Sequence, residues 1–342
     1  MSGIEYYAST ILIFTFINAI AALGFNLQIG YAGIVNLAIL VLFAVGGYMT
    51  GIAGLQPPPN DGFTHYIGGF GWAFPWDLGF GVVCAGGVSV LLGFVALRRL
   101  RTDYLALSLV AILQGLQVVV VSDRLLFNGT TGLVNIPVPG IDQLTPDQFQ
   151  WAFAAISLVA LIATYLIIAR VTSSPLGRAI KAVREDEEAA ASLGRDPWMF
   201  KLVAFVIGGC AAGLAGGLTA LYATGWSPAA WLTPESLLLL TAVIVGGRGR
   251  NIGAILGAFI VYGLVAQAAN LIPPGDLTAR LPEIQTILLG TLLLVFLWFR
   301  PEGVLPETKE KFPPRGRAPM TMGSNAGPLG GSAVSASTER QG

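Results

Sequence analysis

Seven charged side chains are gathered in one short segment, residues 174–194, of a chain that is otherwise poor in charge. They are Arg178, Lys181, Arg184, Glu185, Asp186, Glu187 and Glu188. Only 11% of the 342 residues are charged, whereas ordinary soluble domains reach about 25%. Charged side chains of both signs form ion pairs and charge-assisted hydrogen bonds with a partner. The segment is therefore expected to touch something in water.

The same segment has the pattern of an amphipathic helix. Ser174 is a good N-cap, and Pro175 suits the first helical position. An apolar stripe recurs at helical spacing in Leu176, Ala179, Ile180 and Val183. Such a helix can dock into a groove on a soluble partner or lie on a membrane surface. The acidic run 185–188 favours the soluble partner, because anionic lipid repels it.

Composition places the rest of the chain in a membrane. The sequence is 54% hydrophobic, and its mean hydropathy is +0.71. Apolar stretches run through almost all of residues 1–305, which are predicted to form one transmembrane domain. Residues 306–342 are rich in Pro, Gly, Ser and Ala, and they are predicted to form a disordered cytoplasmic tail.

Several kinds of chemistry are disfavoured by what the sequence lacks. There is no G-x-x-x-x-G-K-[ST] motif for nucleotide hydrolysis. His65 is the only histidine, which argues against a metal site and against acid–base catalysis in the membrane. The formal net charge is zero, so no basic surface for nucleic acid is expected. A transport role without a cofactor is expected, not an enzyme.

Nine apolar stretches approach the roughly 20 residues that a membrane-spanning helix needs. They are residues 7–27, 32–54, 78–97, 104–121, 151–169, 201–223, 235–247, 252–272 and 285–299. With the N-terminus outside, every cluster of Lys and Arg falls on the cytoplasmic side, together with residues 174–194. The predicted fold is an all-α polytopic membrane protein with about nine to ten transmembrane segments. The stretch 235–247 is too short to cross alone.

The interiors of these stretches hold neutral polar groups. The carboxylates Glu5, Asp77, Asp103 and Glu235 stand at the ends of the stretches. A proton-driven carrier usually places ionisable groups inside its spans, so the energy for transport is expected to come from elsewhere. The candidates for the substrate pathway are polar residues inside spans, namely Asn26, Tyr31, Asn36 and Gln114.

Two glycine patterns concern how the helices approach one another. Gly30 and Gly33 permit a break after the first span, which is interpreted either as a tight cytoplasmic hairpin or as a re-entrant segment lining the pathway. Small residues repeat every four positions in the sixth span, as Gly208, Ala212 and Gly216 and as Gly209, Gly213 and Gly217. This spacing favours close packing of helices within the chain over a dimer interface.

Several separated motifs together resemble one known family. They are residues 23–27, 30–33, 43–48, 97–98, 103–107, 131–133, 177–180 followed by 184–185, 188–190 with Gly194, 245–247 with Gly249 and Gly253, and 299–303. In this order the chain resembles the permeases of bacterial ABC importers for branched-chain amino acids, specifically the M-type (LivM-like) subunit. Residues 35–39 depart from the family's pattern.

The resemblance implies an ABC importer permease of the bacterial cytoplasmic (inner) membrane. Its implied partners are a second, homologous permease chain, two cytoplasmic ATPase subunits, an extracytoplasmic solute-binding protein and membrane lipid. The residues implied to couple the permease to the ATPases are Arg178, Arg184, Glu185, Glu188, Ala189, Ala190 and Gly194. The expected substrates are branched-chain or other neutral amino acids. The alternatives are a urea or short-chain amide permease of the same architecture and an ion-coupled secondary carrier.

Overall fold

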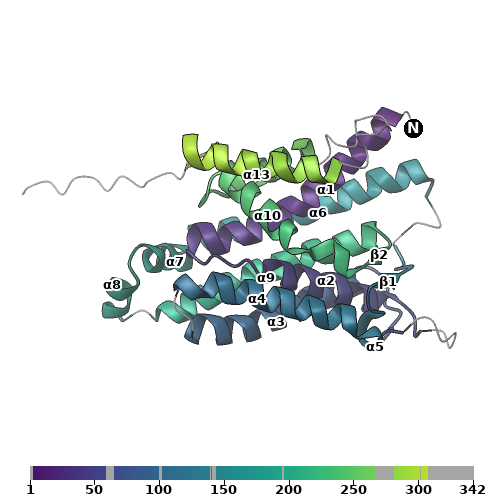
Figure 1. The fold of residues 1–342 in the computed structure, drawn as a ribbon, viewed down its shortest axis with the longest axis horizontal. Helices are drawn as coiled ribbons and strands as arrows, with labels where there is room; N and C mark the ends of the chain where they lie inside the picture. Colours follow the sequence, from purple (N-terminus) through teal and green to yellow (C-terminus); the bar gives the residue numbers. More distant parts are fainter. Residues whose placement is uncertain are drawn as a thin grey trace, which may run out of the picture. The chain divides into compact units, whose positions relative to one another are not determined.

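The structure is a computed structural model of the chain, and it is mostly helical (Figure 1). It describes residues 3–58, 65–99, 102–138, 140, 144–194, 196–265, 281–300 and 302–306. The tail predicted for residues 306–342 lies outside the described residues except for Pro306. The last part of the predicted span 252–272 lies outside them as well.

The elements follow one another with short connections. The first half comprises α1 (Gly3–Asn26), the π-helix η1 (Leu27–Tyr31), α2 (Ile39–Gly54), α3 (Trp76–Arg99), α4 (Thr102–Ser122), α5 (Arg124–Phe127), β1 (Leu133–Val134) and α6 (Pro146–Ser173). The second half comprises α7 (Pro175–Glu185), α8 (Glu187–Ser192), α9 (Pro197–Tyr222), β2 (Gly225–Trp226), the 3₁₀-helix η2 (Pro228–Trp231), α10 (Thr233–Gly246), α11 (Asn251–Ala258), the π-helix η3 (Phe259–Val265) and α13 (Leu281–Phe299). Strands β1 and β2 pair antiparallel, with Leu133 opposite Trp226.

Among the described residues, five helices are long and apolar enough to cross a membrane. They are Glu5–Tyr31, Trp76–Arg98, Tyr104–Ser122, Pro146–Ser173 and Pro197–Tyr222. Four further apolar helices are shorter: Ile39–Gly54, Pro234–Gly246, Asn251–Val265 and Thr286–Phe299. The polytopic helical fold is therefore confirmed, while the number of nine to ten spans stays a prediction.

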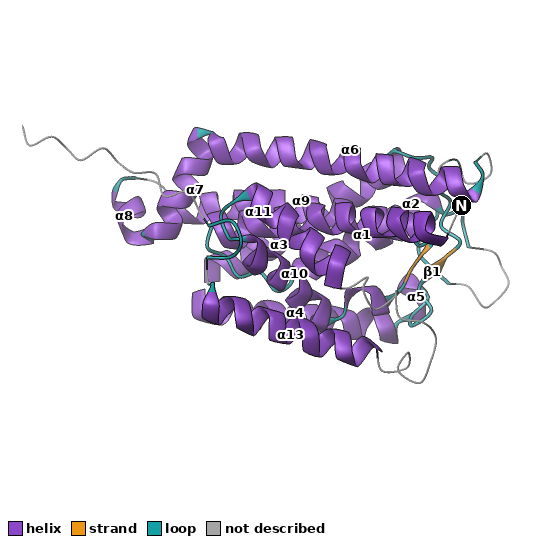
Figure 2. Ribbon diagram, turned by 90° about the horizontal axis from the view of Figure 1, so that it is seen from above, coloured by secondary structure: helices purple, strands orange, loops and turns teal. Residues whose placement is uncertain are grey.

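Helix α9 lies among α1, α2 and α3, and its small residues set the spacing (Figure 2). A Cβ atom added to Gly46 of α2 would lie 2.0 Å from the carbonyl oxygen of Gly213 in α9. Gly208 of α9 makes a similarly close approach to Gly24 of α1. The prediction that these small residues serve packing within the chain is confirmed. Helices α6 and α13 lie on opposite sides of this bundle in Figure 2.

The second span begins later than the sequence predicted. Residues 32–38 are not helical, and α2 starts at Ile39 instead of near residue 32. The side chain of Asn36 explains the delay, because its Oδ1 accepts a hydrogen bond from the backbone N–H of Ala38 at 3.1 Å. Asparagine competes in this way with the backbone bonds of a helix.

The predicted basic clusters meet at the end of the bundle that carries α7 and α8. The guanidinium of Arg98 stacks 5.7 Å from the ring centroid of Trp198, at the start of α9. Arg250 donates to the carbonyl oxygen of Pro306 at 3.4 Å. This common end agrees with placing all the clusters on one side of a membrane.

Candidate functional site

The charged segment predicted to be one helix is two helices with a break at Asp186. Ser174 caps α7, because its Oγ accepts a hydrogen bond from the N–H of Gly177 at 3.4 Å, and Pro175 is the first helical residue. Both start signals were predicted and are confirmed. The backbone of Asp186 is extended, and its carboxylate accepts from the N–H of Ala189 at 2.9 Å. Asp186 thus ends α7 and caps α8, as short acidic side chains do.

The burial of α7 follows the predicted stripe. Ala179, Ile180 and Val183 are buried, and Leu176 packs against the core from its edge. Arg178 and Glu185 stand exposed on the opposite side. The amphipathic pattern therefore seats α7 on the membrane helices and leaves a charged face towards the surroundings.

Helix α8 presents most of the remaining predicted coupling residues. Glu188 and Ala189 are exposed, whereas Ala190 is buried. Gly194 is exposed and has a φ of +75°, a left-handed conformation that favours glycine after a helix. The exposed face for a partner thus comprises Arg178, Glu185, Glu188, Ala189 and Gly194; these five residues are called the docking face below.

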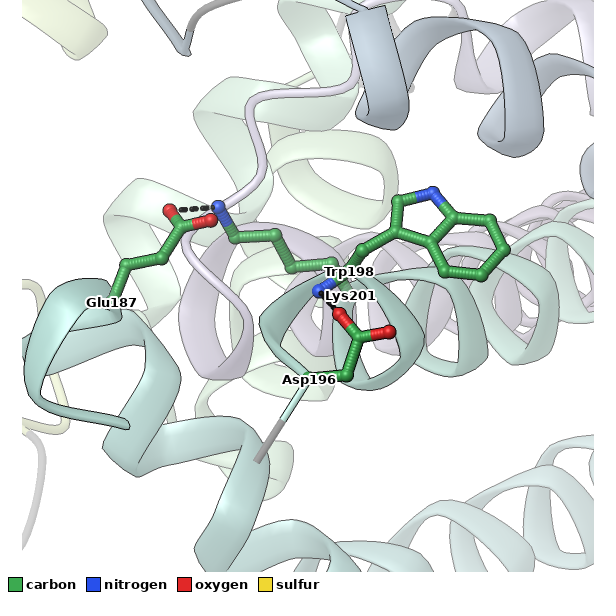
Figure 3. Close-up of polar contacts among 4 residues, drawn as sticks. All are labelled: Glu187, Asp196, Trp198 and Lys201. Carbon is green, nitrogen blue, oxygen red and sulfur yellow. Dashed lines mark hydrogen bonds and ion pairs between the residues drawn. The ribbon is translucent and has the colours of Figure 1, made fainter. Parts of the chain in front are cut away.

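An ion pair holds α8 against α9. The Nζ of Lys201 lies 2.5 Å from the Oε2 of Glu187, as Figure 3 shows. Nearby, the carboxylate of Asp196 accepts from the N–H of Trp198 at 3.1 Å and so caps α9 (Figure 3). The docking face is therefore tied to α9, which packs on α1, α2 and α3.

Arg184 faces into the protein and not towards a partner. Its Nη1 donates a hydrogen bond to the carbonyl oxygen of Gly30, in η1. The ammonium of Lys181, one turn earlier, lies 5.1 Å from the ring centroid of Tyr31, a cation–π distance. A Cβ atom on Gly33 would lie 2.9 Å from the Cγ of Arg184. The two basic side chains thus join α7 to the break after α1.

Asn26 joins the same break to two other elements. Its Oδ1 accepts a hydrogen bond from the N–H of Gly249 at 2.9 Å, and its Nδ2 donates to the Oδ1 of Asn251 at 3.4 Å. Asn251 in turn donates to the Oγ1 of Thr172 at 3.3 Å. Since Thr172 is in the last turn of α6, directly before α7, this chain of bonds links α1, the α10–α11 turn and the entry to α7.

Gln28 and Asn36 form a second buried pair. Asn36 donates to the Oε1 of Gln28 at 3.0 Å, and Gln28 donates to the carbonyl oxygen of Phe205 in α9 at 2.9 Å. Both side chains are 0% exposed. Buried amides that are bonded in this way stabilise one arrangement of helices. Residues Arg184, Gly30, Asn26, Asn251, Thr172, Gln28 and Asn36 are called the coupling network below.

The predicted pathway residues therefore separate into two groups. Asn26, Tyr31 and Asn36 are brought together in and beside the coupling network, and all three are buried. Gln114 lies on α4 with an exposed side chain. The segment Leu27–Tyr31 is wholly buried, as irregular backbone in a membrane must be. Sequence reasoning passed over Thr172 and Asn251, because only the fold brings them to Asn26.

Comparison with known proteins identifies the class of protein. Residues 7–297 match the family described as branched-chain amino acid transport system / permease component. The match covers well over half of the chain, so the chain belongs to this family of multi-pass membrane permeases. No solved structure gives a significant match.

Individual relatives narrow the comparison. The high-affinity branched-chain amino acid transport system permease protein LivM of Salmonella typhimurium is 30% identical over 318 residues, which cover 86% of this chain and 69% of the relative. The probable branched-chain amino acid transport permease protein LivM of Methanocaldococcus jannaschii is 28% identical, with 90% and 95% covered. The nucleoside ABC transporter permease protein NupC of Lactococcus lactis is 25% identical, with 84% and 89% covered.

Proposed function

We propose that this chain is a permease subunit of an ATP-binding-cassette importer that moves branched-chain or other neutral amino acids across the bacterial cytoplasmic membrane. The family match over residues 7–297 supports the permease role. The names of the LivM relatives support the substrate class. A urea or short-chain amide permease and an ion-coupled carrier are not favoured, because no relative named here carries such a substrate or mechanism.

The proposed energy source is a pair of cytoplasmic ATPase subunits that contact the docking face. The observation that carries this proposal is the division of α7 and α8 into a buried stripe and an exposed, charged face. Opposite charges on that face can form charge-assisted hydrogen bonds with a partner. Its position at the end of the bundle where the basic clusters meet supports a cytoplasmic location.

The coupling network would carry the motion into the membrane helices. ATP-driven closure of the ATPases would shift α7, and the bond from Arg184 to Gly30 would move the end of α1 with it. The bonds of Asn26 would extend the shift to the α10–α11 turn. Arg184 therefore acts inside the subunit in this account, while Arg178, Glu185 and Glu188 contact the ATPase.

The other partners are a second, homologous permease chain that completes the pathway and an extracytoplasmic binding protein that delivers the substrate. A relative named as the partner type, LivH of Escherichia coli, is itself 24% identical to this chain over 306 residues. Homology between the two permease types supports a heterodimer whose halves share one architecture. Membrane lipid surrounds the exposed apolar faces of α3 and α6.

The docking face is tested by reversing the charge of Glu188 in the complete transporter. Glu188→Arg is expected to lower leucine uptake and substrate-stimulated ATP hydrolysis about tenfold, because a like charge is placed where a charge-assisted contact stood. Glu302→Arg is the matched control, since Glu302 is also exposed but lies outside α7 and α8. Unchanged hydrolysis and uptake in Glu188→Arg, with intact assembly, would remove the docking assignment.

A further inference from the structure

A cavity lies between the N-terminal halves of α10 and α13, at the end of these helices away from α7 and α8. Its volume is about 270 Å³, slightly below the roughly 300–1,000 Å³ of small-molecule sites. Leu237 and Leu238 line it from α10, and Leu289 and Leu293 line it from α13. The walls are therefore mainly aliphatic, and the space suits a ligand no larger than an amino acid.

One carboxylate faces this aliphatic space. Glu235 lines the cavity from the first turn of α10 and is half-buried. Within the described part of the chain, no lysine or arginine pairs with it. Its charge reaches the phenol of Tyr262, in η3. A carboxylate in apolar surroundings favours a cationic partner, because an uncompensated charge there is costly.

The chemistry of the lining matches one kind of molecule. A branched-chain amino acid carries an ammonium group next to a branched aliphatic side chain. The first group complements Glu235, and the second complements the four leucines. The cavity also exposes the hydroxyl-bearing residues Thr241 and Thr286, which provide polar groups without a second charge. Urea and amides have no ammonium group and would leave Glu235 unpaired.

We propose that this cavity is a substrate subsite in which Glu235 binds the ammonium group of the transported amino acid. The inference rests on the proposed function and adds the subsite to it. The site lies within the membrane permease and is separate from the docking face and from the coupling network. None of the four pathway residues predicted from the sequence lines it.

Two substitutions test the subsite from opposite walls. Glu235→Gln keeps the size of the side chain and removes its charge, so uptake of labelled leucine by the complete transporter in liposomes is expected to fall about tenfold or more. Glu235→Asp keeps the charge and is expected to transport better than Glu235→Gln. Gly290→Leu fills the cavity from α13, where nothing lies within 4 Å of an added Cβ atom, and it is expected to block uptake to a similar extent.

Each substitution has a matched control. Glu5→Gln removes another first-turn glutamate, from α1, and Gly87→Leu adds a leucine at an exposed position of α3 where an added Cβ atom also meets nothing within 4 Å. Both controls are expected to transport at the wild-type rate. Basal ATP hydrolysis and co-purification of the subunits report whether each variant assembles.

The outcomes separate this inference from the proposed function. Loss of uptake in Glu235→Gln and Gly290→Leu, with assembled complexes and active controls, supports the subsite. Wild-type uptake in both variants overturns it. If Glu235→Gln does not assemble, Gly290→Leu decides, and normal uptake there assigns Glu235 a structural role. The proposed function itself fails in a different way, when the wild-type complex takes up no leucine, isoleucine or valine.

Discussion

The coupling network and the cavity between α10 and α13 treat their polar groups in opposite ways. In the coupling network, amides and a guanidinium from distant parts of the chain bond to one another: Arg184 to Gly30, and Asn26 to Gly249. In the cavity, the carboxylate of Glu235 faces open space between leucines. Satisfied networks hold helices in a fixed relation, whereas an unpaired charge in a cavity favours a ligand. The contrast assigns transmission of motion to one region and contact with the substrate to the other.

The largest effect is expected where the coupling network is most tightly packed. A Cβ atom on Gly30 would lie 2.4 Å from both the Oδ1 of Asn26 and the backbone nitrogen of Gly249. Gly30→Leu should therefore destabilise the protein by about 3 kcal/mol or more, since overpacking forces the backbone apart. The measurement is the apparent melting temperature of the detergent-purified protein.

The control for this change is Gly115→Leu on α4. An added Cβ atom at Gly115 meets nothing within 4 Å, so the melting temperature should stay within a degree or two of the wild type. Equal melting temperatures for Gly30→Leu and the wild type would contradict the tight packing of the coupling network and remove the contrast with the cavity.

The smallest effect is expected at the surface, in the ion pair between Glu187 and Lys201. Their side chains are 52% and 17% exposed, and pairs of this kind contribute about 0.5 kcal/mol. Lys201→Met should therefore change the melting temperature only slightly, and raising the salt concentration should remove most of the difference. A loss as large as that of Gly30→Leu would show that the contact between α8 and α9 belongs to the transmitting region.

Local sequence patterns were sufficient for the elements themselves. The N-cap Ser174, the first-turn Pro175 and the stripe of Ala179, Ile180 and Val183 are all signals within one helical turn or two, and the structure confirms each. The small residues of α9 likewise predicted close packing, because a four-residue spacing places them on one face. The membrane character followed from hydropathy alone.

Contacts between distant residues were beyond the sequence. Arg184 and Gly30 are 154 positions apart, and Asn26 and Gly249 are 223 apart. No periodic pattern links such pairs, so Arg184 was assigned only to a partner, and Asn26 and Asn36 were assigned to the pathway for being polar inside a span. The break at Asp186 was missed for a different reason, because the acidic run reads equally well as the middle of one helix.

The ratio of leucine imported to ATP hydrolysed is the most direct test of how the subunit works. In Arg184→Met the long side chain remains, but the hydrogen bond to Gly30 is lost, so α7 would still bind the ATPase and would no longer move the end of α1. The account predicts near-normal ATP hydrolysis with uptake reduced about tenfold, a change of about 1.4 kcal/mol in coupling. An unchanged ratio in an assembled Arg184→Met complex would contradict transmission through this contact.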